Sequence, residues 1–326
     1  LLSPYLRQGK NEILILLQSS NTPELEAGSH KPSAERFSGS YLFAQHRKHI
    51  YDYDARIVPN SKGKGFILEL DIAVRNDFNF EETIQVGFDI YDPKGKLKEY
   101  SVNEMQVAGR SIDTLSFNPD IYHAYDFRWG DGKTPLYDVM IYIKRNGMLW
   151  EYIPLKVGFG KTEYRNGKFY RFDEVLHIQK REHFNATPDR EQTYKEIEQA
   201  KLRGYNTLCP DYPQPKWFYD MCDKAGMFVI DCANINSPTN SSNRAIGGTP
   251  ANDPKLVDEY LQRVKSMYYR TRNHACIVAY ALGGDAAGNG YNMYKAYQWL
   301  KRVEKNRAVI CTSADGEWNS DAQIDN

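Results

Sequence analysis

The sequence carries no excess of charge of either sign. Its 42 lysines and arginines balance 42 aspartates and glutamates, so no long-range field favours nucleic acid or an anionic membrane surface. The longest early apolar run, Ile13 to Leu17, falls far short of the roughly 18 residues that a membrane span needs. We therefore expect neither nucleic acid nor a membrane as a partner.

The first residues lack the features of a secretory signal. The stretch "LLSPYLRQGKNEILILL" has neither a basic start nor a small-residue cleavage site. It is typical of the interior of a folded domain, which is compatible with a start further upstream. The compartment therefore stays unknown, with cytoplasm and periplasm both open.

Cysteine pairs are also missing. The number of cysteines is odd and none forms a CxxC motif, which argues against a disulfide framework and a structural zinc site. Several lie within or just after apolar runs, where cysteine acts as a small hydrophobe. We expect free, buried thiols at all of them: Cys209, Cys222, Cys232, Cys276 and Cys311.

The region before residue 160 has the pattern of antiparallel strands. "FILELDIAV" (66–74) alternates apolar and acidic residues with period 2. "TIQVGFDIYD" (83–92) repeats this pattern and ends in a turn sequence. Segments 136–144 and 148–159 meet at Asn146-Gly147, a strong hairpin signal. Several short strands over about 110 residues predict an antiparallel β-sandwich.

The first 40 residues differ from the sandwich that follows. One apolar run, Glu12 to Gln18, predicts a strand. It is followed by "NTPELEAGSHKPSAERFSGS", a polar segment with glycine, serine and proline that is typical of a loop. We interpret the pair as the end of an earlier β-domain and its linker.

After residue 160 strands and helices alternate, which implies a parallel sheet, either doubly wound or a (β/α)8 barrel. No GxGxxG or P-loop follows any strand, and this disfavours a nucleotide-binding fold. A barrel takes about 250 residues, so about 165 residues predict only part of one. The expected strands are Val175–Gln179, Asn206–Cys209, Met227–Asp231, Cys276–Leu282 and Ala308–Thr312.

Several strings resemble glycoside hydrolase family 2, the β-galactosidase and β-glucuronidase group, in the same order along the chain. They include "LSPYLRQGKNEILILL", "VGFGKTEYRNGKFY" and "RTRNHACIVAYALGGDAAGNG". The resemblance implies the end of a jelly-roll domain with a linker at 1–40. It also implies an immunoglobulin-like β-sandwich at 41–159, with Trp129 in its core. The first five or so strands of a (β/α)8 TIM barrel are implied at 160–326.

The resemblance implies a catalytic position at the end of the fourth barrel strand. There the family has Leu-Gly-Asn-Glu, with the glutamate as general acid/base and the asparagine binding the sugar. This chain has Leu282-Gly283-Gly284-Asp285. Asp285 keeps a carboxyl that is one methylene shorter, and Gly284 removes the amide. The family's nucleophile follows the seventh barrel strand, so no residue here matches it.

Other matched positions imply substrate contacts without a metal or other cofactor. Asn236 and Pro238 stand where metal-dependent members carry a carboxylate and an imidazole, and neither suits magnesium. His183 and His274 are isolated in sequence, and we interpret both as structural. Besides Gly284, the expected sugar-binding residues are Arg181, Asp211, Tyr212, Asn234 and Trp318.

Simpler interpretations stay open for these residues. From spacing alone, Asp285 is more typical of a carboxylate that caps the following segment or pairs with a cation. Tyr212 is compatible with packing in a rigid loop, and Trp318 with covering exposed core. The first hypothesis is a β-galactosidase-like retaining hydrolase with a degenerate site and a carbohydrate substrate. The alternative is a non-catalytic carbohydrate-binding or scaffold protein. A homo-oligomer would cover the open edge of a partial barrel.

Overall fold

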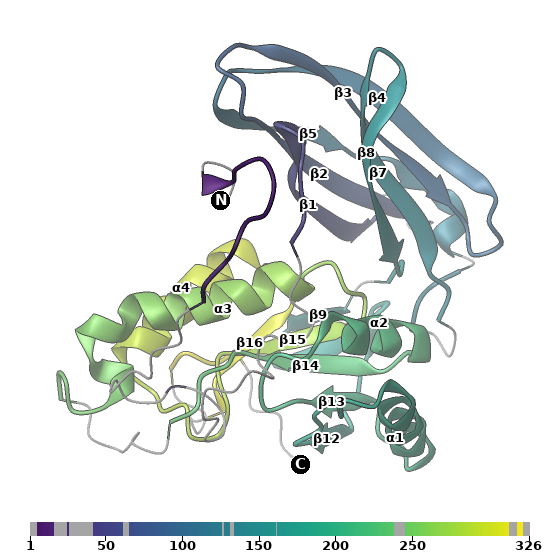
Figure 1. Cartoon of the computed structure of the whole chain (residues 1–326). Coiled ribbons are helices and arrows are strands. Elements are labelled where there is room, and N and C mark those ends of the chain that lie inside the picture. Colours follow the sequence, from purple (N-terminus) through teal and green to yellow (C-terminus); the bar gives the residue numbers. More distant parts are fainter. Residues whose placement is uncertain are drawn as a thin grey trace.

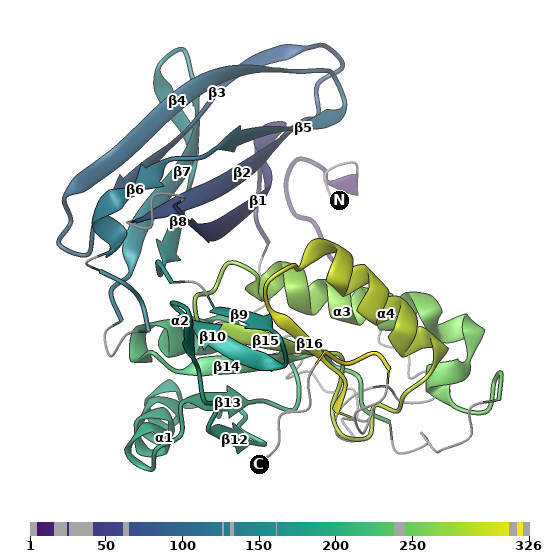
Figure 2. The ribbon, with the colours of Figure 1, turned by 180° about the vertical axis from the view of Figure 1, so that it is seen from behind.

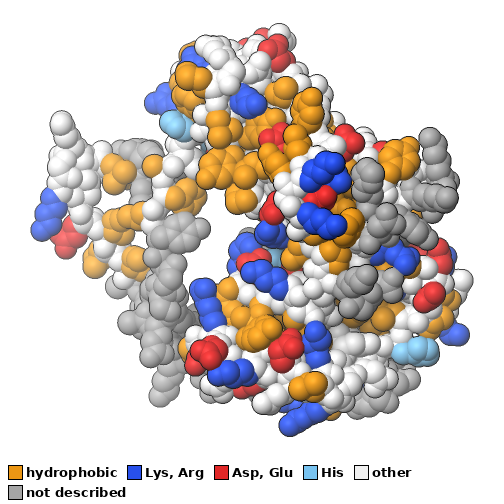
Figure 3. Space-filling view, turned by 90° about the vertical axis from the view of Figure 1, so that its right-hand side faces the viewer, with side chains coloured by type: hydrophobic (Ala, Val, Ile, Leu, Met, Phe, Trp, Pro, Cys, Tyr) orange, Lys and Arg blue, Asp and Glu red, His pale blue; other side chains and the backbone are white. Residues whose placement is uncertain are grey.

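The computed structural model describes residues 5–15, 25, 42–60, 65–125, 127–130, 134–160, 162–237, 245–312 and 318–321. Within them an all-β part lies above a part in which helices pack on a parallel sheet (Figure 1). No helix in these ranges is long and apolar enough to cross a membrane. Figure 3 shows basic and acidic side chains interspersed over one face, as the balanced composition predicts.

The all-β part is a sandwich of two antiparallel sheets, and this confirms the prediction. The alternation seen in segment 66–74 becomes strict burial of every second residue of β2, and these residues form one face of the core. One sheet contains β1 (Lys48–Pro59), β2 (Phe66–Asn76), β5 (Ser111–Phe117) and β6 (Asp120–Ile121). The other has the order β4 (Leu97–Val107), β3 (Glu82–Tyr91), β7 (Tyr137–Arg145) and β8 (Met148–Val157).

The hairpin between β7 and β8 has the predicted turn. Asn146 and Gly147 both have positive φ, 50° and 78°, as a type I′ turn requires. The turn sets the register that pairs Arg145 with Met148. A register shift between Ile143 and Lys144 then moves the pairing by one residue, so that Ile143 lies opposite Glu151 and Val139 opposite Leu155. The turn and this shift together decide which face of β8 meets the core.

The lower part contains a five-stranded parallel sheet with strands in chain order, the beginning of a barrel. This confirms the predicted partial barrel. Its strands are β12 (Lys180–Glu182), β13 (Thr207–Cys209), β14 (Phe228–Cys232), β15 (Ile277–Ala281) and β16 (Ala308–Ile310). The α-helices are α1 (Arg190–Leu202), α2 (Lys216–Ala225), α3 (Val257–Thr271) and α4 (Tyr291–Val303). The 3-10 helices are η3 (Tyr122–Tyr125), η4 (Pro250–Asn252) and η5 (Pro254–Leu256).

Capping residues in the sequence mark where α1 begins and α2 ends. The Asp189 side chain accepts hydrogen bonds from the backbone N–H groups of Glu191 and Gln192 and so caps α1. Gly226 ends α2 in the left-handed conformation, with φ 71°. These caps fix where each helix turns back toward the next strand of the sheet.

Two expectations about the sheet region were wrong. Val175–Gln179 is not the first parallel strand, because β12 begins at Lys180, and residue 175 instead ends β11 (Glu174–Val175). Trp129 is fully buried, but it packs against Phe228 of β14 rather than in the sandwich core. Its indole N–H donates to the backbone carbonyl of Asp223 at 2.7 Å.

A small antiparallel sheet lies against the parallel one. It contains β9 (Thr162–Arg165), β10 (Lys168–Arg171) and β11, and Figure 2 shows β9 and β10 beside β14 to β16. The backbone N–H of Tyr164 donates to the carbonyl of Asn306 at 2.8 Å. The guanidinium of Arg171 lies over the Trp129 and Phe228 rings. These contacts cover one end of the sheet.

The predicted strand at 12–18 is not seen where the structure describes it. Residues 12–15 form no strand and are exposed, and 16–18 lie outside the described residues. Further along, Leu25 is buried in the core of the parallel-sheet part, and its carbonyl accepts from the Asn236 N–H at 2.8 Å. The jelly-roll remnant therefore stays a prediction.

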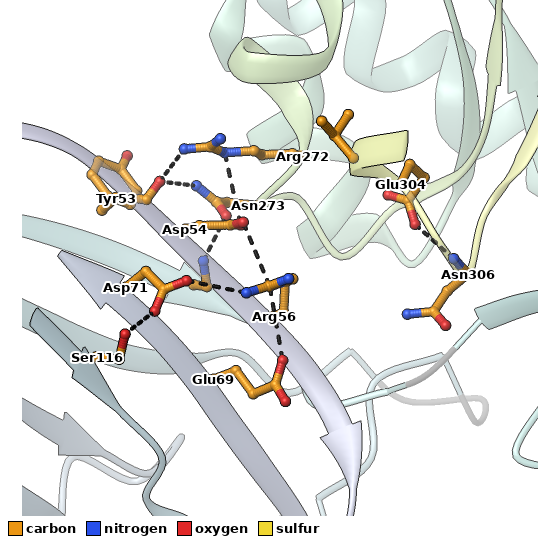
Figure 4. Close-up of polar contacts among 12 residues, drawn as sticks. Tyr53, Asp54, Arg56, Glu69, Asp71, Ser116, Arg272, Asn273, Glu304 and Asn306 are labelled. Atoms are coloured by element: carbon orange, nitrogen blue, oxygen red, sulfur yellow. Dashed lines mark hydrogen bonds and ion pairs between the residues drawn. The ribbon is translucent and has the colours of Figure 1, made fainter. Parts of the chain in front are cut away.

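Polar contacts join the two parts (Figure 4). The buried Arg272 guanidinium donates to Asp52 Oδ1 at 2.8 Å and to the Tyr53 carbonyl at 2.6 Å. Asn273 accepts from the Ala55 N–H at 2.9 Å. Burial raises the pKa of Asp54, although the Arg272 charge opposes this. The loop between α3 and β15 is thereby fixed against β1.

Candidate functional site

Polar residues follow the parallel strands where each strand ends. His183 comes directly after β12, Asp211 follows β13, Asn234 follows β14 and Asp285 follows β15. The carboxyl ends of parallel strands meet at one edge of the sheet, where barrel enzymes place their active sites. We call this edge, with the loops at 183–187, 210–214, 233–237 and 283–287, the strand-end edge.

A histidine–aspartate pair lies on this edge. His183 Nδ1 is 2.6 Å from Asp211 Oδ1, and the His183 side chain is 66% exposed. The hydrogen bond and the charge of Asp211 raise the pKa of His183 above its usual value, and the charge of Asp285 raises it further. His183 also has a positive φ of 52°. Three loops therefore bring His183, Asp211 and Asp285 into one electrostatic environment.

A hydrogen-bond network holds Asp211 in place. Asn185 donates to Asp211 Oδ2 at 2.7 Å and accepts from the Asp211 N–H at 3.0 Å. Gln214, which is 1% exposed, donates to Asn185 Oδ1 at 3.1 Å and accepts from the Ala186 N–H at 2.8 Å. Its amide also donates to the Tyr212 carbonyl at 2.6 Å. Gln214 thus ties the loop after β12 to the loop after β13.

The network continues into the core. The Gln214 N–H donates to the Tyr219 hydroxyl at 2.9 Å, and that hydroxyl donates to Asp231 Oδ1 at 2.7 Å. Thr271 donates to Asp231 Oδ2 at 2.8 Å. Burial raises the pKa of Asp231, while the hydrogen bonds from Tyr219 and Thr271 oppose this. A continuous series of hydrogen bonds therefore connects the exposed His183–Asp211 pair to the buried carboxylate of Asp231.

Gly284 lies against the amide of Asn236. A Cβ placed on Gly284 would meet Asn236 Cγ at 3.3 Å and Nδ2 at 3.4 Å. The Asn236 Oδ1 is buried and has no hydrogen-bond partner among the described residues. The neighbouring Asp285 is exposed. A neutral amide therefore occupies the space that a side chain at 284 would otherwise enter, beside the candidate acid.

The donor set does not suit the magnesium ion that metal-dependent family members bind. The position matched to their carboxylate ligand carries Asn236, whose buried amide oxygen is neutral. Magnesium is held mainly by carboxylates, phosphates and waters. Pro238, matched to the imidazole ligand, lies outside the described residues.

The cysteines at this edge are protonated thiols. Burial raises the pKa of the Cys209 thiol to about 12. Burial also holds the pKa of Cys232 well above its usual value, and the charges of Asp231, Asp211 and Asp285 act in the same direction. Since the thiolate is the nucleophilic form, neither cysteine is suited to covalent catalysis here.

The other expected sugar-binding residues make contacts of their own. The Arg181 guanidinium lies 5.8 Å from the centre of the Phe184 ring, and Tyr212 is half-buried. The Asn234 carbonyl accepts from Arg263 at 2.7 Å. Trp318 is 47% exposed and its ring lies 5.7 Å from that of Tyr294. Of the predicted residues, Asp211 contacts His183 directly, and the charge of Asp285 helps to raise the pKa of the same histidine.

Sequence reasoning missed His183, Asn185 and Gln214. His183 and Asp211 are 28 residues apart, and only the parallel pairing of β12 with β13 brings their loops together. The available signal was the position of His183 immediately after a strand, where polar residues meet at a common edge.

Comparison with known proteins agrees with this fold. Residues 164–325 match the family model of the TIM barrel domain of glycosyl hydrolases family 2. A β-galactosidase of Streptococcus thermophilus is 25% identical over 94% of this chain and 30% of its own length. A β-galactosidase of Pectobacterium atrosepticum is 28% identical over 76% of this chain and 23% of its own length.

A solved structure shares the fold. The β-glucuronidase of Bacteroides uniformis superposes with a TM-score of 0.66 at 15% identity, covering 81% of this chain and 34% of that one. The class that the fold and the family model define is a protein with the TIM barrel domain of the glycosyl hydrolases. The chain belongs to glycosyl hydrolases family 2, and it spans about a third or less of the curated relatives named here.

Proposed function

We propose that the strand-end edge binds a β-galactoside or related sugar in a protein of the retaining glycosidase type. The observation that carries this is the contact of His183 Nδ1 with Asp211 Oδ1 at 2.6 Å on the edge where β15 leads into Asp285. Barrel enzymes act at this edge. The named β-galactosidases, with which this chain shares 25% and 28% identity, support galactosides as the sugar class.

In this proposal Asp285 donates a proton to the glycosidic oxygen. It is exposed at the end of β15, where a sugar oxygen can reach it. His183, kept cationic by Asp211 to a higher pH than an isolated histidine, donates a hydrogen bond to a sugar hydroxyl. Retaining hydrolysis also needs a nucleophilic carboxylate about 5–5.5 Å from the acid. Asp211 is already engaged by His183 and Asn185, so we assign the nucleophile to none of the described residues.

The second candidate is sugar binding without hydrolysis. Gly284 favours it, because this position offers no side chain to hold a substrate hydroxyl, and Asn236 fills the adjacent space. Hydrogen bonds to a sugar hydroxyl at this place strengthen in the transition state, so their absence weakens turnover more than ground-state binding. Binding can therefore persist after turnover has fallen.

One paired experiment separates the two candidates. Hydrolysis of a chromogenic β-galactoside and a β-glucuronide is measured with the native sequence, with Asp285→Ala and with Asp113→Ala, an exposed sandwich position. Binding of galactose and lactose is followed by tryptophan fluorescence. The enzyme proposal expects turnover that only Asp285→Ala abolishes. Sugar binding without turnover supports the second candidate, and absence of both refutes the proposed function.

A further inference from the structure

Three metal-ligating side chains meet away from the strand-end edge, where α2 approaches the start of β15. Asp223 lies near the end of α2, and His274 and Cys276 lead into β15. One ligand atom of each lies within 4.8 Å of the other two. Asp223 is 2% exposed and Cys276 is fully buried, while the His274 side chain is 12% exposed.

Hydrogen bonds already orient this group. Asp223 Oδ1 accepts from the Cys276 N–H at 2.8 Å, which fixes the carboxylate and leaves Oδ2 facing the imidazole. His274 Nδ1 lies 2.6 Å from that Oδ2. The Asp223 carbonyl accepts from the Trp129 indole at 2.7 Å. The Cys276 N–H therefore holds one carboxylate oxygen and the imidazole meets the other, while the indole fixes the backbone of the same residue.

We propose that Asp223, His274 and Cys276 form a binding site for a zinc-class divalent cation, with water as the fourth ligand. Carboxylate oxygen, imidazole nitrogen and thiolate sulfur are all zinc donors, and three protein ligands plus water make a common tetrahedral set. Magnesium and calcium, which require oxygen ligands, are poorly matched to a set containing sulfur. The cysteine spacing gave no indication of this site, since it contains a single cysteine and its aspartate lies 51 residues before the histidine.

The movement required of the Asp223–His274 pair is small. Zinc–ligand lengths of about 2.0 Å to oxygen and nitrogen place those two atoms about 3.3 Å apart in a tetrahedral site. The Asp223–His274 pair, now at 2.6 Å, must open by about 0.7 Å, within reach of a rotation about side-chain bonds. On binding, the Cys276 thiol releases its proton to solvent, and the imidazole proton moves from Nδ1 to Nε2. The bound ion then replaces two hydrogen bonds, that of His274 with Asp223 and the weak one from the Cys276 thiol to the Tyr219 carbonyl, with three coordinate bonds to the protein.

A cavity gives the ion and its water a route. It has a volume of about 390 Å³ and lies between the sandwich and α2, with Asp223 and His274 in its lining. Leu136 and Pro154 of the sandwich side line it, as does Arg270 of α3. A site with ligands on α2 and at the start of β15 would tie the helix to the strand, so metal binding would stabilise the fold.

Cobalt(II) is the probe, because its thiolate complexes absorb in the near ultraviolet and its tetrahedral sites in the visible. We expect one equivalent of cobalt to produce both absorptions in the native protein and zinc to displace it. Zinc should also raise the melting temperature. Cys276→Ser should remove the near-ultraviolet band, and His274→Gln should weaken cobalt binding at least about tenfold.

Cys209→Ser is the matched control, because Cys209 is a partly buried cysteine at the opposite end of the parallel strands, and it should keep the native spectrum. If saturating cobalt gives the native protein no thiolate band, the proposal is refuted, whatever the variants do. Retention of the band in Cys276→Ser, with native circular dichroism, refutes it equally.

Discussion

Gln214→Ala tests the network that supports the strand-end edge. The side chain is buried and makes three hydrogen bonds, with Asn185, Tyr212 and Ala186. Each buried polar group left without a partner costs about 1–3 kcal/mol. Water can reach some of them, because Asn185, Ala186 and Tyr212 are only partly buried. We therefore expect a loss of about 2–4 kcal/mol in the free energy of unfolding.

The assay is urea denaturation, with a histidine NMR titration on the same protein. Without the hydrogen bond from Gln214, Asn185 should position Asp211 less well, and the hydrogen bond between Asp211 and His183 should weaken. The pKa of His183 should then fall toward its ordinary value of 6.5. Gln192→Ala is the control, because Gln192 is exposed on α1 and its side chain bonds only to Glu196 among the described residues. It should cost less than about 0.5 kcal/mol. Equal stability of both variants, with an unchanged His183 titration, would refute the reasoning.

Three further predictions concern the site, the sandwich and the junction. Asp211→Asn should lower the pKa of His183, as measured by NMR. The pKa of His183 is raised in the folded state. The Asp211–His183 pair therefore stabilises the fold fully below the histidine pKa of the unfolded chain, and this stabilisation is lost as the pH rises through the histidine pKa of the folded protein. The part of the cost that comes from the His183 charge should thus be under about 1 kcal/mol at pH 5 and vanish by pH 9, leaving only the pH-independent cost of disturbing the Asn185 contact; a cost that does not change with pH would contradict this. Gly147→Ala, at φ 78°, should cost about 1–2 kcal/mol in urea denaturation, whereas a cost near zero would exclude the I′ turn. Trp129→Phe should cost about 2–4 kcal/mol through removal of the indole hydrogen bond and the cavity left behind; an unchanged melting temperature would contradict its place in the core.

The sequence predicted elements whose burial is periodic. Segment 66–74 became β2 because every second residue can face one core. The expected strand Val175–Gln179 failed for a different physical reason. Its apolar residues Leu176 and Ile178 do pack against the core, but outside any parallel pairing. The paired strand is the polar Lys-Arg-Glu segment at the sheet's edge, where fewer neighbours impose an apolar pattern.

The candidate site was predicted only in part. Asp211 and Asp285 were identified from matched positions after strands, and both lie at the strand-end edge. Their partner His183 was not, because side-chain contact between two loops depends on strand register and on the positive φ of His183. Trp129 shows the same limit. Its burial was predictable from residue type, but the part of the molecule that buries it depends on tertiary packing.

The most direct test of the account is an NMR titration of the His183 imidazole with lactose, in the native sequence and in Asp285→Ala. The account predicts a saturable shift of the His183 resonance, weakened at least about tenfold by the substitution and unchanged in Asp113→Ala. Absence of a saturable shift in the native protein, or equal affinity in Asp285→Ala, would contradict the claim that this edge binds sugar beside Asp285.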